Sequence, residues 1–168
     1  GSGSSQITVN PSSTLDSSTE YYVLIDASAF DDVSSNSYAG ISSTTALSFT
    51  TGDTSNPTLS SSTPADNATG VTIDANIVLN FSESVDAETG NITIKKTSDD
   101  STVETIDVTG SKVTGSGSSQ ITVNPSSTLD ITTEYYILID ATAFDDSSSN
   151  SYAGISLTTA LSFTTNSC

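Results

Sequence analysis

The chain of 168 residues contains no histidine, no arginine and no tryptophan, and it has a single cysteine. Without histidine, a nucleophilic triad lacks its usual general base and a zinc site lacks one of its usual ligands. Two carboxylates alone can hydrolyse a glycosidic bond, but that reaction needs a sugar cleft with aromatic walls, which a chain without tryptophan is poorly equipped to build. We therefore expect that the protein is not an enzyme.

Positive charge is scarce as well, because three lysines face twenty acidic residues and the net charge is −17. Such a chain cannot neutralise phosphates, so nucleic acid is excluded as a partner. Two interpretations of the acidity stay open. In the first, the acidic residues keep the protein soluble in a salty extracellular medium, where screening weakens their repulsion. In the second, some carboxylates hold Ca²⁺, a hard cation that prefers oxygen ligands.

Long apolar runs and paired cysteines are missing too. Hydrophobic residues make up 33% of the chain, below the globular average of roughly 45–50%. No run of about 18 apolar residues could cross a bilayer, so we expect no membrane insertion. Cys168 has no partner within the chain, which excludes a disulfide framework. Its role as an added handle, a natural end or a dimerising thiol stays open.

What the sequence does contain is a long internal repeat. Residues 115–165 repeat residues 1–51 at an offset of 114 positions, with six differences. The differing pairs are Ser17/Ile131, Ser18/Thr132, Val23/Ile137, Ser28/Thr142, Val33/Ser147 and Ser43/Leu157. The block between the copies, residues 52–114, occurs once. If one repeat unit consists of this block followed by residues 115–165, the chain contains the second half of one unit and then one complete unit. This period exceeds that of a solenoid, and each unit should be a domain.

The repeat predicts the domain organisation. Residues 1–51 are the C-terminal half of an upstream repeat, and residues 52–56 are a linker of turn-forming residues. Residues 57–165 are one complete repeat, and residues 166–168 are a tail. We call residues 57–114 the first-half segment, and we call residues 115–165 and their copy 1–51 the second-half segments.

Short alternating apolar runs predict an all-β protein. In the complete repeat the expected strands are 58–62, 76–81, 91–96, 103–108, a brief strand about Val113, 120–123, 134–140 and 160–164, with a loop over 82–90. That is about seven to eight strands in roughly 110 residues, which is typical of a Greek-key β-sandwich. In the upstream half the expected strands are 6–9, 20–26 and 46–51.

The penultimate strand carries a further signal. Leu129 precedes Tyr135 by six residues, a spacing that favours a tyrosine corner, in which the hydroxyl bonds back to the chain. This register points Tyr135, Ile137 and Ile139 inward, and likewise Tyr21, Val23 and Ile25 upstream. Tyr136 and Leu138, with Tyr22 and Leu24 upstream, then fall on the opposite face. They are either a contact patch or are covered by a loop or a ninth strand.

Two parts of the sequence resemble a known family. The stretch STPADNATGVTIDANIVLNFSESV, residues 62–85, is similar to the opening of bacterial Ig-like domains of S-layer proteins and giant surface adhesins. The second half fits the same pattern through Leu129, Tyr135, Asp146, Asn150 and Phe163–Thr165. The resemblance covers residues 57–165, and residues 1–51 by repetition. One departure is Ser149 (Ser35 upstream), where the family often has glycine.

The resemblance implies an Ig-like tandem repeat at the bacterial cell surface or in an extracellular fibre. Members of the family serve mainly as stalk or spacer modules, so the implied partners are neighbouring repeats of the same protein. The alternative is a ligand-binding module that contacts a glycan or a surface. A binding module should expose an aromatic platform, whereas a spacer should bury its aromatic residues.

The acidic loop is the candidate metal site. Several oxygen donors within about 11 residues can wrap a calcium ion. The candidate ligands are Asp140, Asp145, Asp146 and Asn150, and upstream Asp26, Asp31, Asp32 and Asn36. The spacing is not that of an EF-hand, and the alternative is a loop whose carboxylates bind backbone N–H groups in Asx turns.

The upstream half lacks a first half of its own. It is expected to be frayed, to pair with residues 57–114 in place of residues 115–165, or to complete a sheet with another chain. Near identity of the two copies makes such an exchange almost neutral in free energy, which favours domain swapping. Because every chain carries one surplus second half, pairing between chains would give a dimer or a filament. A further alternative is that the natural protein has other ends.

Overall fold

The computed structural model describes residues 2–167, so Cys168 and the expectations about its thiol lie outside the described residues. The chain divides into unit 1, which ends at Thr54, and unit 2, which begins at Ser55. All regular structure within residues 2–167 is β, which confirms the all-β prediction. No helix in this part of the chain has the length and hydrophobicity needed to cross a membrane.

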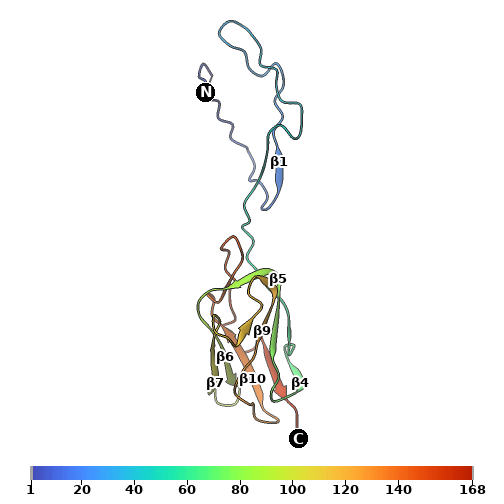
Figure 1. The fold of residues 1–168 in the computed structure, drawn as a ribbon, viewed down its shortest axis with the longest axis vertical. Coiled ribbons are helices and arrows are strands. Elements are labelled where there is room, and N and C mark those ends of the chain that lie inside the picture. The colour runs from blue at the N-terminus through green and yellow to red at the C-terminus, as the bar shows by residue number, and fades with distance from the viewer. Residues whose placement is uncertain (1, 168) are drawn as a thin grey trace. The chain divides into compact units, whose positions relative to one another are not determined.

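Unit 2 is a sandwich of two sheets (Figure 1). The first sheet has the order β4 (Ala68–Val71), β12 (Ser162–Thr165), β10 (Glu134–Ile139), β6 (Asn91–Lys96) and β7 (Thr102–Asp107). The second has the order β11 (Phe144–Asp145), β5 (Ile77–Ala87), β9 (Ser118–Val123) and β8 (Val113–Thr114), and β3 (Leu59–Thr63) also pairs with β5. Each sheet therefore combines strands of the first-half segment with strands of the second-half segment.

About seven to eight strands are expected from the sequence, and unit 2 has ten, because β4 and β11 were not among the expected strands. Eight of them have four or more residues, and β8 and β11 have two each. The predicted loop over 82–90 is wrong, because β5 continues to Ala87. Val85 is fully buried and pairs with Ser118 of β9, and Ala87 pairs with Phe144 of β11. These contacts with distant parts of the chain extend the strand.

The core lies between the two sheets and contains the residues that alternation points inward. Within unit 2 these are Ile77, Leu79, Phe81, Ile92, Ile94, Ile106, Val108, Ile121, Val123, Tyr135, Ile137, Ile139, Leu161 and Phe163, and all of them are buried. The ring of Phe81 packs on Phe144 at 5.4 Å and edge-on to Tyr152 at 5.1 Å between centroids. Phe81 belongs to the first-half segment and both partners to the second, so the core joins the halves.

Tyr136 is covered by another part of the chain. Of the two alternatives for the outer face, a contact patch or cover by a loop or strand, the structure shows cover at this residue. Its side chain is buried, and its hydroxyl donates a 3.0 Å hydrogen bond to Asp100 in the β6–β7 turn. The Lys95 ammonium lies 5.9 Å from the ring centroid. Leu138 is half-buried. A turn of the first-half segment therefore covers this part of the outer face.

Unit 1 has little regular structure despite its nearly identical sequence. It has β1 (Glu20–Tyr22) paired with β2 (Ser48–Thr50), so the predicted strands 20–26 and 46–51 shorten to three residues each. The strand predicted over 6–9 is wrong, because these residues form no strand. The counterparts of these residues in unit 2, residues 120–123, form part of β9, and β5 and β8 pair with them. Within residues 2–54 no strand pairs with residues 6–9, and a strand needs partners to form.

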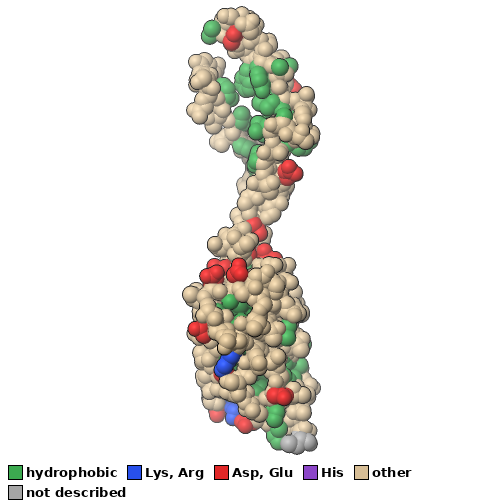
Figure 2. Space-filling view, viewed as in Figure 1, with side chains coloured by type: hydrophobic (Ala, Val, Ile, Leu, Met, Phe, Trp, Pro, Cys, Tyr) green, Lys and Arg blue, Asp and Glu red, His purple; other side chains and the backbone are tan. Residues whose placement is uncertain are grey.

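The missing partners also expose the apolar side chains of unit 1. Val23, predicted to lie inside, is 36% exposed, whereas its counterpart Ile137 is fully buried. Tyr22 and Leu24 are about half exposed. Figure 2 shows hydrophobic side chains gathered on the visible face of unit 1, while the visible face of unit 2 is mostly polar.

Candidate functional site

The Asp-rich loop of unit 2 follows β10 and folds through short-range contacts. Ala143 and Phe144 are fully buried and anchor the loop in the core. A backbone bridge between Asp145 and Ser151 closes it. Gly154, with φ of +74°, lets the chain return beside β10, because a Cβ there would lie 2.4 Å from the carbonyl oxygen of Ile139. These contacts fix the positions of the predicted ligands.

Asp146 organises the tip of this loop. Its Oδ1 accepts 2.8 Å hydrogen bonds from the backbone N–H groups of Ser148 and Asn150, and its Oδ2 accepts one of 2.8 Å from the Asn150 side chain. These bonds, led by the one from the Asn150 side chain, hold the pKa of Asp146 below its ordinary value although the residue is buried. This is the Asx-turn geometry of the alternative interpretation.

The loop adopts the same geometry in unit 1. Asp32 accepts hydrogen bonds of 2.8 to 2.9 Å from Ser34 and from the backbone and side chain of Asn36. Ser149 and Ser35 have φ of +65° and +63°, in the left-handed region that favours glycine. The loop therefore folds from its own sequence, without help from a first-half segment.

The other predicted ligands take separate places. Asp140 accepts a 2.8 Å hydrogen bond from the backbone N–H of Asn91, while Asp145 pairs with Asp86 of β5. Among residues 2–167, Asp140, Asp145 and Asp146 do not form a group of three whose carboxylate oxygens lie within 4.8 Å of one another. The same holds for the upstream trio of Asp26, Asp31 and Asp32. Calcium binding at these loops stays a prediction.

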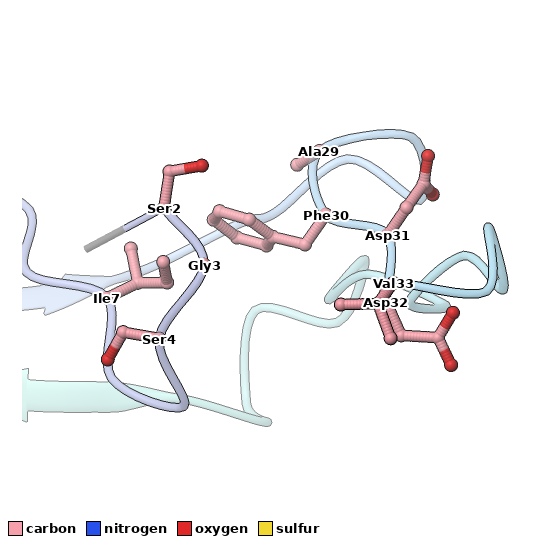
Figure 3. Close-up of a pocket in the computed structure, with 9 residues that line it drawn as sticks. All are labelled: Ser2, Gly3, Ser4, Ile7, Ala29, Phe30, Asp31, Asp32 and Val33. Atoms are coloured by element: carbon pink, nitrogen blue, oxygen red, sulfur yellow. The ribbon is translucent and has the colours of Figure 1, made fainter.

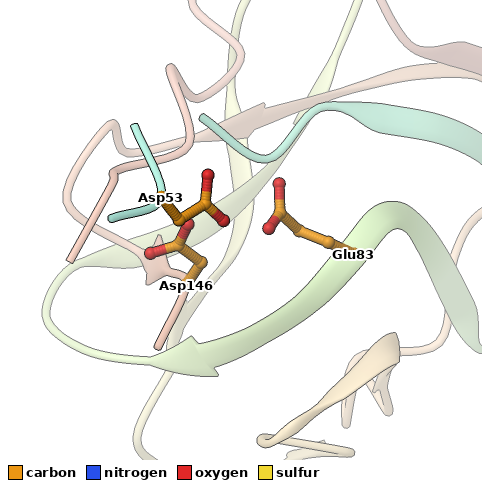
Figure 4. A group of neighbouring side chains, drawn as sticks. All are labelled: Asp53, Glu83 and Asp146. Atoms are coloured by element: carbon orange, nitrogen blue, oxygen red, sulfur yellow. The ribbon is translucent and has the colours of Figure 1, made fainter. Parts of the chain in front are cut away.

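Glu83 is a neighbour of Asp146 that sequence reasoning missed. Carboxylate oxygens of the two residues lie within 4.8 Å of each other (Figure 4). Glu83 falls in the predicted loop over 82–90, but it lies on β5. The available signal was the alternation of apolar residues at Ile77, Leu79, Phe81 and Val85. Asp53, drawn in the same figure, belongs to unit 1, where it accepts a hydrogen bond from Ser17.

A second polar feature of unit 2 joins its two halves. Glu104 of β7 is 9% exposed and forms a salt bridge of 2.5 Å with Lys112. Glu104 also accepts hydrogen bonds of 2.9 to 3.2 Å from the backbone N–H groups of Ser126 and Ser127 and from the hydroxyl of Ser126. Burial raises the pKa of Glu104, but the hydrogen bonds from Lys112 and the two serines outweigh it and lower the pKa to about 2.

Four further polar contacts cross between the halves of unit 2. They are Asp66 with Ser162 at 2.9 Å, Asn91 with Asp140 at 2.8 Å, Lys96 with Asp130 at 2.6 Å, and Tyr136 with Asp100 at 3.0 Å. Together with Glu104 they border an apolar core, so the interface between the halves has a buried centre and a polar rim.

Unit 1 presents the corresponding surface without a cover. An apolar groove of about 530 Å³ is lined by Ile7, Val9, Val23, Leu24, Ile25, Asp26, Ala29, Phe30 and Leu47. A neighbouring pocket of about 440 Å³ is shown in Figure 3, where the Phe30 ring points toward Ser2 and Ile7. We call the residues that line the groove the open face.

Comparison with known proteins places the sequence in a family. A sequence model of the bacterial Ig-like domain matches residues 1–51 and, separately, residues 53–165. The chain belongs to the bacterial Ig-like domain family. A crystal structure of the S-layer protein rSbsC matches 67% of the chain at 18% identity, with a TM-score of 0.44. The match spans 14% of that protein's chain. No curated protein matches the sequence.

Proposed function

We propose that the chain is a structural spacer, or stalk, repeat of an extracellular bacterial adhesin or surface fibre. The observation that carries the proposal is the burial of every aromatic side chain of unit 2. These residues are Phe81, Tyr135, Tyr136, Phe144, Tyr152 and Phe163. A glycan-binding face needs exposed rings for stacking, so this distribution favours the spacer over the ligand-binding module.

The pairing of β4 with β12 also supports a mechanical role. The two strands are parallel neighbours, with Phe163 opposite Ala68 and Thr165 opposite Val71. The backbone N–H of Asn166 donates a 2.7 Å hydrogen bond to the carbonyl oxygen of Val71. Tension that pulls β4 and β12 in opposite directions along their axes loads these hydrogen bonds together rather than one after another.

Single-molecule pulling of the whole chain between its ends tests this role. We expect one high-force event that releases roughly 110 residues, or about 40 nm at ~3.6 Å per residue. Asn166→Pro removes a donor to β4 and should lower the force, whereas the matched Gly52→Pro in unit 1 should not. Extension without a force peak, together with saturable glycan binding, would favour the binding module instead.

The proposal has two further elements. Neighbouring repeats of the protein are the expected partners, with strand complementation between chains as the means of assembly. Calcium is the candidate cofactor, supported by the proximity of the Glu83 and Asp146 carboxylates, since a cation would relieve their repulsion and cross-link the loop to β5.

A further inference from the structure

We propose that the free edge of β3 in unit 2 pairs with the β3 edge of a second copy of the chain. The two strands run antiparallel, with the Ser61 of one chain opposite the Ser61 of the other, so the two sheets continue into one another across a two-fold axis. This inference rests on the proposed spacer function, because it names a contact through which repeats of separate chains associate.

The outer edge of β3 has no partner strand. All the backbone pairs of β3 are with β5, from Leu59 opposite Phe81 to Thr63 opposite Val78. No other strand within residues 2–167 pairs with β3. The side chains of Ser60, Ser61 and Thr63 are exposed. A strand with one unpaired edge is a template for the addition of another strand.

The other edge strands of unit 2 are protected against such pairing. β7 carries two acidic residues, and one of them, Glu104, is buried under the edge. β8 and β11 have two residues each. β4 contains Gly70 with φ of +71°, and its register with β12 is irregular. Charges, short strands and irregular backbone all oppose edge pairing. β3 has five residues and no charge, so it is the edge that remains open to pairing.

A row of polar side chains crosses this sheet and ends at β3. The side-chain amide of Gln120 on β9 donates a 2.9 Å hydrogen bond to Asn80 on β5. The side-chain amide of Asn80 donates one of 3.1 Å to the Ser61 hydroxyl oxygen. That hydroxyl also has a hydrogen to donate, and the structure shows no acceptor for it among residues 2–167. In the proposed pair the opposite Ser61 hydroxyl accepts it, so the row continues into the second chain.

The lack of charge around β3 favours a second copy of the chain as the partner. Because the net charge is −17, most surfaces of two copies repel each other. Residues 58–63 carry no charge. Nor do residues 152–160, which together with Leu59 line a groove of about 400 Å³. A serine hydroxyl both donates and accepts hydrogen bonds, so this edge is complementary to itself under two-fold symmetry.

Leu157 gives the contact an apolar component. It lines the same groove and is 66% exposed, more than any other large apolar side chain in the described part of unit 2. A strand added to β3 lies beside this groove and covers part of Leu157. The counterpart of Leu157 in unit 1 is Ser43, so the chain itself supplies a polar replacement for the test.

Two prolines limit the length of the contact. Pro57 and Pro64 border the pairing segment, and proline has no backbone N–H to extend a ladder. Six residues from each chain form a contact well below the roughly 800 Å² per partner of a stable interface. A single pair is therefore weak, and several repeats in tandem would strengthen it through avidity.

Cysteine cross-linking detects such a weak pair. The test uses the full chain with Cys168→Ser, so that each variant has one cysteine. Residues directly opposite in an antiparallel pair have Cα atoms about 4.5–5.5 Å apart, which a disulfide can bridge. Under mild oxidation we expect Ser61→Cys to form a disulfide dimer at least about tenfold faster than the control Thr105→Cys, which lies at an exposed position of β7.

Substitutions in the non-covalent pair identify the surface. Sedimentation velocity at rising concentration, in reducing buffer, measures self-association. Ser61→Asp places two carboxylates opposite each other and should weaken association at least about tenfold. Thr105→Asp adds the same charge to another edge and should not. Leu157→Ser should weaken association several-fold, whereas Ile131→Ser, which also replaces an exposed apolar side chain by its unit 1 counterpart, should leave it unchanged.

Three results would overturn the proposal. The first is cross-linking of Ser61→Cys no faster than that of Thr105→Cys. The second is self-association that Ser61→Asp leaves intact, which would assign it to another surface, such as the open face of unit 1. The third is equal weakening by Leu157→Ser and Ile131→Ser. Each of these results leaves the single-molecule pulling behaviour of a spacer unchanged, so the two proposals fail separately.

Discussion

The hydroxyl oxygen of Tyr135 accepts a 2.8 Å hydrogen bond from the backbone N–H of Asp130. This is the predicted tyrosine corner. Tyr21 and Asp16 repeat it in unit 1 at 2.9 Å. The corner therefore forms from residues close in sequence, whereas the core beneath it forms only in unit 2. Local contacts and the partner segment thus contribute separately to this fold.

Removing the Tyr135 hydroxyl should destabilise unit 2. Tyr135→Phe leaves the Asp130 N–H without its acceptor at a partly buried site, and we expect a loss of about 1–2 kcal/mol in the free energy of unfolding. Tyr21→Phe, at the same position of unit 1, should leave the melting of unit 2 unchanged. Denaturant unfolding of both variants checks this. Equal destabilisation by the two substitutions would show that the units unfold as one.

Glu104 should make unit 2 sensitive to acid. Its pKa is about 2 in the folded state, below the 4.5 of an unperturbed glutamate. Its contribution is therefore present above pH 4.5 and is lost as the pH falls toward 2, with a magnitude of up to about 3 kcal/mol. Glu104→Gln should lower stability at pH 7 and flatten the fall in this window. A parallel pH profile for the variant and the parent chain would contradict the assignment.

Ser149 is a position where glycine should stabilise the loop. Its φ of +65° costs a residue with a Cβ about 1 kcal/mol, and glycine avoids that cost. Ser149→Gly should raise the free energy of unfolding by about 0.5–1 kcal/mol, and Ser148→Gly, at an ordinary φ, should not raise it. Chemical denaturation measures both. A loss of stability with Ser149→Gly would refute the strain argument.

Calcium binding predicts a rise in melting temperature. At a concentration about ten times the Kd, a bound ion adds about 1.4 kcal/mol, which corresponds to roughly 5 °C for a domain of this size. Melting is compared in EDTA and in millimolar Ca²⁺. Glu83→Gln should abolish the rise, and Asp74→Asn, which removes the same charge elsewhere, should preserve it. If Ca²⁺ leaves the parent's melting temperature unchanged, the calcium proposal fails.

Alternation along the chain predicted many of the buried side chains of unit 2, but not Val85, Phe144 or Tyr152. It identified Ile77, Ile92, Ile137 and Phe163, because a strand with one face in a core must alternate. It also placed Tyr136 on the opposite face, although only the structure shows that the Asp100 turn covers it.

Sequence reasoning missed features that depend on distant partners. The continuation of β5 to Ala87 follows from pairing with β11, which lies more than fifty residues away. Because that continuation was not foreseen, Glu83 was assigned to a loop and its proximity to Asp146 was missed. The predicted strand over 6–9 failed for the same kind of reason, since the sequence has strand character but unit 1 supplies no neighbouring strand.

Hydrogen exchange at residues 6–9 and 120–123 most directly tests whether a second-half segment forms its strands only when a first-half segment pairs with it. The two stretches have the same sequence, Gln-Ile-Thr-Val, so their intrinsic exchange rates are equal. NMR can resolve them because their surroundings differ. We predict strong protection of residues 120–123 and exchange of residues 6–9 at the rate of an unstructured peptide. Equal protection of both stretches in the chain alone would contradict the account.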